Sequence, residues 1–152
     1  MITVNARSLR PQLKRDVLKK LIIENDPHIV VVVETWWDQA DEPKIHPNYI
    51  GVLTDPKGSR GVAVLYKPQF NIKQCLRVGD RSIVMSLQQD QFELTLVACY
   101  VAPKTRAVQE DVLQFLNQHQ SDPGAHIIMA GDFNDGVKPL ENAAKRWGLN
   151  CS

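Results

Sequence analysis

The sequence has 152 residues, of which 43% are hydrophobic and 23% are charged, and its formal net charge is +1 at pH 7. This length suits one domain with an ordinary core, and the composition excludes a disordered or low-complexity chain. A net charge so close to zero neither supports nor excludes nucleic-acid binding, because a local basic patch would not show in the total.

The cysteines and the first residues of the chain indicate in which cellular compartment the protein is expected. Cys75, Cys99 and Cys151 lie far apart and form no C-x-x-C pair. The sequence therefore suggests neither a disulfide framework nor a zinc site. No basic segment followed by an apolar core begins the chain, and no apolar run approaches the ~18 residues that span a membrane. We predict one intracellular domain over residues 1–152, nuclear or cytoplasmic, not secreted and without a membrane partner.

The first predicted elements are a short strand and an amphipathic helix. Ile2–Val4 is an apolar start that ends at Asn5. Over Leu9–Glu24, apolar residues recur at a spacing of four while basic side chains fill the rest of the turn, which predicts a helix. Pro11 fits its first turn, and Asn25-Asp26-Pro27 ends it. The apolar stripe consists of Leu9, Leu13, Val17 and Leu21, joined by Leu18 and Ile22.

The middle of the chain reads as strands. His28–Glu34 is a continuous apolar run without alternation, which predicts a strand covered on both faces. Two antiparallel hairpins follow, because turn-rich segments separate Tyr49–Thr54 from Gly61–Lys67 and Ser82–Leu87 from Phe92–Tyr100.

The last part of the sequence returns to helices and a buried strand. Val108–His119 has the apolar spacing of a helix and leads into the apolar run that begins at His126. Pro139–Gly148 is predicted to be a short final helix, with proline near its start and glycine just past its end.

The segment His126–Asn134, H-I-I-M-A-G-D-F-N, carries the clearest functional signal. In an extended strand Asp132 and Asn134 would point the same way, because alternate side chains share a face. A carboxylate beside an amide can handle a metal, a water and a phosphate. The alternative is that Gly-Asp-Phe-Asn is only a turn after a buried strand, since these are usual turn residues. Both interpretations stay open on these residues alone.

Three further polar residues stand at predicted strand ends. Glu34 follows four valines, so its carboxylate must reach water, a cation or a metal. It could also be an ordinary strand-end acid in solvent. Asn5 could bind a metal-bound water or a phosphate oxygen, or cap the next turn. Tyr100 would place its hydroxyl where the chain leaves the sheet, although a strand-end tyrosine alone is more often core packing.

Taken in order, these residues resemble the endonuclease/exonuclease/phosphatase superfamily, whose fold is DNase I-like. The local amino-acid sequence is most similar to that of the endonuclease domain of non-LTR retrotransposons. E-T-W and G-D-F-N are the most specific parts, and the resemblance spans nearly the whole chain. The matching segments are N-A-R-S-L (5–9), D-P-H-I-V-V-V-V-E-T-W-W (26–37), R-G-V-A-V-L-Y-K (60–67), Y-V-A-P (100–103) and G-D-F-N (131–134).

This resemblance implies a four-layered α/β sandwich, two mixed sheets with helices outside, that cleaves DNA phosphodiesters with Mg²⁺ or Mn²⁺. It implies that Glu34 ligates the metal with Asn5 close by, and that Asp132 orients or deprotonates the attacking water. Asn134 would bind the scissile phosphate, and Tyr100 would donate to a phosphate oxygen. The basic residues expected to bind substrate beside these motifs are Arg7 and Lys104.

The sequence also departs from the family pattern. Members normally continue after G-D-F-N to a late aspartate and a Ser-Asp-His, whereas this sequence stops at Cys151-Ser152. We therefore expect a domain truncated at its C-terminus, with an incomplete second sheet and an open edge. None of the four histidines occupies the family position, and losing a general acid or base costs ~100 to 10,000-fold in rate. Tyr100-Val101-Ala102-Pro103-Lys104 also has one residue more than the commoner Tyr-x-Pro-Asn.

Three functions remain open on the sequence. The first is a DNA endonuclease that is feeble or inactive as this chain. The second is a non-catalytic module that binds a protein partner, or a second copy of itself, through the open sheet edge. The third is a phosphatase or phosphodiesterase of the same superfamily that acts on a nucleotide or a lipid headgroup.

Overall fold

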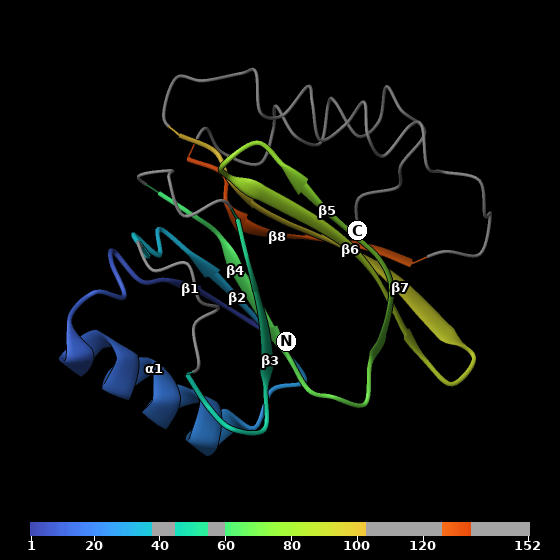
Figure 1. Ribbon diagram of the computed structural model, residues 1–152, viewed down its shortest axis with the longest axis horizontal. Helices are drawn as coiled ribbons and strands as arrows, with labels where there is room; N and C mark the ends of the chain where they lie inside the picture. Colours follow the sequence, from blue (N-terminus) through green and yellow to red (C-terminus); the bar gives the residue numbers. More distant parts are fainter. Residues whose placement is uncertain (38–44, 55–59, 103–125, 135–152) are drawn as a thin grey trace.

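The structure is a computed structural model that describes residues 1–37, 45–54, 60–102 and 126–134. These residues form two four-stranded mixed sheets, with one helix outside the first sheet (Figure 1). The helices predicted over Val108–His119 and Pro139–Gly148 fall outside the described residues, as does Lys104. In the part of the chain that is described, no helix is long and apolar enough to cross a membrane.

The first sheet has the order β1-β2-β4-β3. Its strands are β1 (Ile2–Asn5), β2 (Ile29–Val33), β3 (Ile50–Leu53) and β4 (Ala63–Tyr66). β1 runs parallel to β2, whereas β4 is antiparallel to both β2 and β3. All five residues of β2 are buried, because its side chains point alternately to a core between the sheets and to a core beneath the helix. The strand is covered on both faces, as its unbroken apolar run predicted.

Helix α1 (Gln12–Asn25) begins after Pro11 and ends at Asp26, whose φ of 41° is left-handed. The predicted apolar face was partly wrong, since Leu13 and Val17 are 73% and 60% exposed. A spacing of four advances about 40° around a helix at each step. The stripe therefore turns from solvent toward the sheet along the helix. The helical side chains that are buried are Leu18 and Ile22.

The second sheet has the order β5-β6-β7-β8. Its strands are β5 (Asn71–Val78), β6 (Ser82–Gln89), β7 (Phe92–Tyr100) and β8 (His126–Asp132). β5, β6 and β7 pair antiparallel, and β8 runs parallel to β7. Both predicted hairpins, β3/β4 and β6/β7, are confirmed. Strand β5 was missed, because most of its side chains are exposed and it lacks a clear apolar alternation.

The core between the sheets holds the two layers together. Ile83, Met85 and Leu96 of the second sheet and Val31 of the first are fully buried in it. Cys99 of β7 is buried outside this core, and its burial raises the pKa of the thiol to about 12. β7 and β8 end together because they are parallel, as do β1 and β2, and both pairs end at the left of the molecule in Figure 1.

Gly131 is required where β8 passes β7. Its φ is 154°, and a Cβ at this position would lie 1.7 Å from the carbonyl oxygen of Cys99. No side chain can be placed there without moving the neighbouring backbone. The glycine that ends the apolar run in the sequence therefore permits a close strand contact.

Candidate active site

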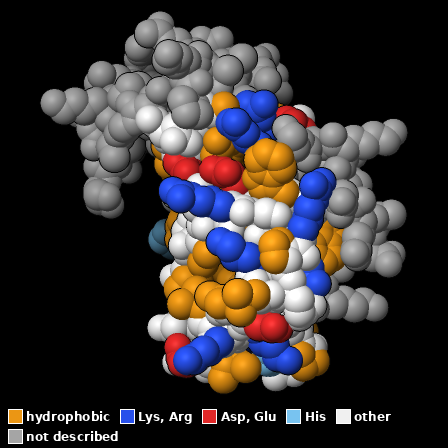
Figure 2. All heavy atoms as spheres, turned by 90° about the vertical axis from the view of Figure 1, so that its left-hand side faces the viewer, with side chains coloured by type: hydrophobic (Ala, Val, Ile, Leu, Met, Phe, Trp, Pro, Cys, Tyr) orange, Lys and Arg blue, Asp and Glu red, His pale blue; other side chains and the backbone are white. Residues whose placement is uncertain are grey.

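The polar residues at the predicted strand ends meet on one rim of the sandwich. Asn5 is the last residue of β1, Glu34 follows β2, and Tyr100 and Asp132 end β7 and β8. Tyr100 and Asp132 are paired in the parallel register. Figure 2, which looks onto this side, shows acidic side chains between groups of Lys and Arg side chains.

Asn5 joins the two carboxylates of this rim. Its Nδ2 donates to Glu34 Oε1 and to Asp132 Oδ2, both at 2.9 Å. Its Oδ1 accepts from the backbone N–H of Arg7 at 3.1 Å. Asn5 and Glu34 come from the first sheet and Asp132 from the second. One amide therefore ties the two sheets together where three predicted site residues lie.

The backbone at Glu34 is held in an unusual conformation. Glu34 has a φ of 53°, a left-handed value that costs a side-chain-bearing residue roughly 1–3 kcal/mol. Two hydrogen bonds hold this turn: Ser8 N–H donates to the Glu34 carbonyl at 2.8 Å, and Thr35 N–H donates to the Gly61 carbonyl at 3.0 Å. The half-buried carboxylate is thereby directed across the rim to Asn5.

The side chains of Asp132 and Asn134 were expected to point the same way, but they do not. The extended backbone ends at Asp132, and Asn134 has a left-handed φ of 39°. Asp132 Oδ1 accepts from Asn134 N–H at 3.3 Å, and Asn134 Nδ2 donates to the Val101 carbonyl at 2.9 Å. Gly131 and Asp132 thus still belong to β8, and the chain bends only at Asn134, so Asp132 meets Asn5 from the end of the strand.

Tyr100 combines a buried ring with a polar contact at the rim. The residue is 3% exposed and belongs to the core between the sheets. Its hydroxyl accepts from Arg60 Nη1 at 3.0 Å, and the Arg60 guanidinium carbon lies 5.7 Å from its ring centroid. No role was predicted for Arg60 from the sequence. Its place before a strand antiparallel to β2 was the available signal, because such a strand begins where β2 ends.

The other predicted groups differ in how closely they approach the rim. Arg7 is exposed and contacts Asn5 through its backbone. His28 precedes β2 and His126 begins β8, so both lie at the strand ends opposite the rim. His46 lines a separate pocket.

The donor set of the rim fits a hard divalent cation. Carboxylate oxygens are the ligands that Mg²⁺ prefers, and two like charges held near one amide are stabilised by a cation between them. Among the described residues, neither Glu34 nor Asp132 forms an ion pair with Lys or Arg. The described part contains no cluster of three His, Cys, Asp or Glu side chains.

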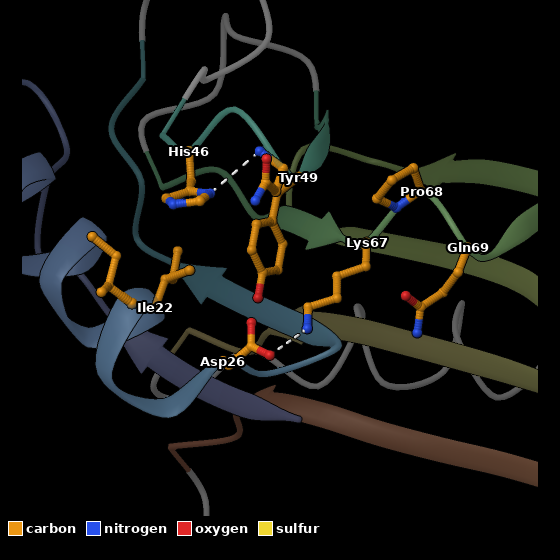
Figure 3. Close-up of a pocket in the computed structure, with 9 residues that line it drawn as sticks. Ile22, Asp26, His46, Tyr49, Lys67, Pro68 and Gln69 are labelled. Carbon is orange, nitrogen blue, oxygen red and sulfur yellow. Dashed lines mark hydrogen bonds and ion pairs between the residues drawn. The ribbon is translucent and has the colours of Figure 1, made fainter.

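A pocket of about 480 Å³ lies at the other end of β2 (Figure 3). Lys67 and Asp26 form an ion pair of 2.8 Å at its wall. Tyr49 donates its hydroxyl proton to the Pro27 carbonyl, and His46 Nδ1 accepts from Asn48 N–H at 3.2 Å. Lys67, Asp26, Tyr49 and His46 therefore already have partners in the fold, and we assign them to its stability.

This ion pair leads to a prediction about acid stability. The hydrogen bond from Lys67 and its charge lower the pKa of the Asp26 carboxyl. The folded pKa is then below the unfolded value of about 3.9, so the stabilisation is present above that pH and is lost as the pH falls through the folded pKa. We expect Lys67→Met to lower the free energy of unfolding at neutral pH, by an amount that is small because Asp26 is exposed and that disappears once the pH falls below the folded pKa of Asp26.

Urea denaturation at several pH values measures this difference. Lys20→Met is a matched control, because Lys20 forms an exposed ion pair with Glu24 at 3.7 Å in the same helix region. A Lys67→Met defect that persists unchanged in acid would contradict the assignment to Asp26.

Comparison with known proteins shows the family of this chain. Residues 2–146 match the Endonuclease/Exonuclease/phosphatase family. The chain belongs to this family. The resemblance predicted from the motifs is thus confirmed, and the family's members are phosphate-ester hydrolases by name.

Solved structures confirm the DNase I-like fold of this family member. The endonuclease domain of TRAS1, a telomere-specific non-LTR retrotransposon, is 15% identical with a TM-score of 0.73, over 98% of this chain and 71% of that one. AP endonuclease LMAP from Leishmania major is 19% identical with a TM-score of 0.67, over 86% and 53%. Truncated Caenorhabditis elegans TDP2 is 16% identical with a TM-score of 0.64, over 88% and 60%. The chain therefore spans little more than half of the last two proteins.

Proposed function

We propose that this chain carries part of the active site of a divalent-metal-dependent phosphodiesterase, a DNA endonuclease of the retrotransposon type. The contact of Asn5 with Glu34 and Asp132 is the observation that carries the proposal. It brings together a candidate metal ligand and a candidate base from different sheets. The family membership and the fold shared with the TRAS1 endonuclease domain support the same function.

In this proposal Glu34 would hold Mg²⁺ or Mn²⁺, and Asn5 would join it once its amide turns so that Oδ1, which accepts from Arg7 N–H in this structure, faces Glu34. The bound ion supplies charge neutralisation where negative charge develops on the phosphate. Asp132 orients the attacking water and accepts its proton, since its carboxylate is held at the same rim. Asn134 binds the scissile phosphate after its amide leaves the Val101 carbonyl. Tyr100 donates to a phosphate oxygen.

Two cations complete the substrate contacts that we propose. Arg7 is exposed beside Asn5 and would bind a DNA phosphate, and Lys104 would bind another. The catalytic histidine that the family resemblance implies is not supplied by the described histidines, which lie away from the rim. Because a missing acid or base lowers the rate ~100 to 10,000-fold, we expect slow nicking by this chain alone.

A nicking assay on supercoiled plasmid with Mg²⁺ tests the proposal. We expect Glu34→Gln to lower the nicking rate and to weaken Mg²⁺ binding, measured by calorimetry, by at least ~10-fold, since a charged ligand is lost. Glu93→Gln is the control, because Glu93 pairs with Lys73 at 2.8 Å far from the rim.

The outcomes also separate the alternatives. A folded chain that neither binds Mg²⁺ nor nicks DNA contradicts the proposal and favours a non-catalytic module. Hydrolysis of bis(p-nitrophenyl) phosphate without plasmid nicking favours a different phosphodiester substrate within the same family.

A further inference from the structure

Arg60 and Tyr100 form a contact at the rim that the functions above do not explain. Arg60 Nη1 donates to the Tyr100 hydroxyl oxygen at 3.0 Å, and the guanidinium carbon lies 5.7 Å from the ring centroid. The guanidinium thus meets both the oxygen and the ring of one side chain. Arg60 is half-buried, and none of the ion pairs between described residues involves it.

The backbone next to Arg60 is held close to the segment that carries Glu34. The Gly61 carbonyl accepts from Thr35 N–H at 3.0 Å, one residue after Glu34. A Cβ on Gly61 would lie 2.9 Å from Thr35 Oγ1, so the two segments are in close contact. Arg60 is therefore anchored to the same backbone that directs Glu34 across the rim.

In the hydrogen bond between Arg60 and Tyr100, the guanidinium donates and the hydroxyl oxygen accepts. A guanidinium has only N–H donors, so the Tyr100 oxygen must act as the acceptor toward Arg60. The phenolic proton is then free to be donated elsewhere. A hydrogen bond accepted from a cation polarises the phenol and strengthens its own donation. The ring is 3% exposed and cannot turn away without disturbing the core.

We infer that Arg60 is a positioning residue that holds the Tyr100 hydroxyl as a donor to a phosphodiester oxygen, and that it adds positive charge beside that oxygen. The inference rests on the proposed phosphodiester substrate of this site. It assigns Arg60 a role that neither the sequence motifs nor the family match supplied. Tyr100 contacts the substrate, and Arg60 acts mainly through it.

A double-mutant cycle measured by binding tests this inference. The probe is a fluorescein-labelled DNA duplex in EDTA, so that binding is read without cleavage. We expect Tyr100→Phe and Arg60→Gln each to weaken binding by about 3 to 10-fold, and the double variant to be little weaker than either single variant. Arg60→Lys should recover part of the loss, because it keeps a charged donor but not the planar stack.

Lys73→Gln is the charge-matched control, since Lys73 pairs with Glu93 at 2.8 Å at the opposite end of the sheet. Circular dichroism verifies that each variant is folded. Multiplicative losses in the double variant, or an affinity of Arg60→Gln equal to that of the wild type, would overturn the inference, as would a wild-type chain that does not bind the duplex. Coupled losses in binding without any plasmid nicking would support the inference while contradicting the proposed catalysis.

Discussion

Replacing Gly131 by alanine is expected to unfold the chain. A Cβ on Gly131 would lie 1.7 Å from the oxygen, 2.8 Å from the carbon and 3.1 Å from the nitrogen of Cys99. These are backbone atoms of β7, which cannot move aside because β7 is paired on both edges. The loss should exceed ~4 kcal/mol, which approaches the whole stability of an ordinary domain. Urea denaturation followed by circular dichroism measures it.

Gly79→Ala is the matched control for this substitution. Gly79 also has a positive φ, 63°, but a Cβ there would meet nothing within 4 Å. Its cost should be only about 1–2 kcal/mol, the strain of a left-handed residue. If Gly131→Ala were as stable as Gly79→Ala, the close approach of β7 and β8 would be wrong.

The Asp132→Asn substitution is expected to remove ~100 to 10,000-fold of any nicking activity while the fold survives. Asp132 accepts from Asn5 Nδ2 at 2.9 Å and from Asn134 N–H at 3.3 Å. Asparagine has the same shape but only one side-chain oxygen, so it can keep only one of these contacts. It also lacks the charge needed to accept a proton from water. The change in unfolding free energy should be only about 1 kcal/mol.

Plasmid nicking and thermal unfolding, measured on the same samples, separate the two effects. Asp16→Asn is the control, because Asp16 accepts from Gln12 Nε2 at 2.8 Å on the exposed helix surface. Nicking by Asp132→Asn at the wild-type rate would remove Asp132 from the proposed mechanism. Loss of structure together with activity would instead assign Asp132 a structural role at the rim, where it joins the two sheets through Asn5.

The sequence predicted those parts of the fold that depend on local pattern and burial. The unbroken valines of β2 predicted burial on both faces, and the turn residues predicted both hairpins. Strand β5 was missed because an exposed edge strand needs no apolar alternation. The buried face of α1 was misplaced because the sequence stripe winds around the helix, and only the sheet decides which part of it is covered.

For the candidate site, the sequence predicted which residues stand at strand ends but not how they connect. Parallel strands bring their carboxyl ends to one edge, so Asn5, Glu34 and Asp132 were expected near each other. That Asn5 would bridge the two carboxylates depends on how one sheet is placed over the other. The direction of Asn134 depends on where β8 stops being extended, and Arg60 meets Tyr100 across 40 positions of sequence. No local pattern encodes these tertiary relations.

The hydrogen bond from Asn5 to Asp132 depends on the distance between the two sheets. Asn5 and Asp132 belong to different sheets, and the packing of side chains such as Met85 and Val31 between those sheets holds them at a fixed separation. A small expansion of this core would break a 2.9 Å contact while leaving every strand ladder intact. We therefore expect the contact between these candidate site residues to be lost at the first loosening of the sandwich, before the secondary structure melts.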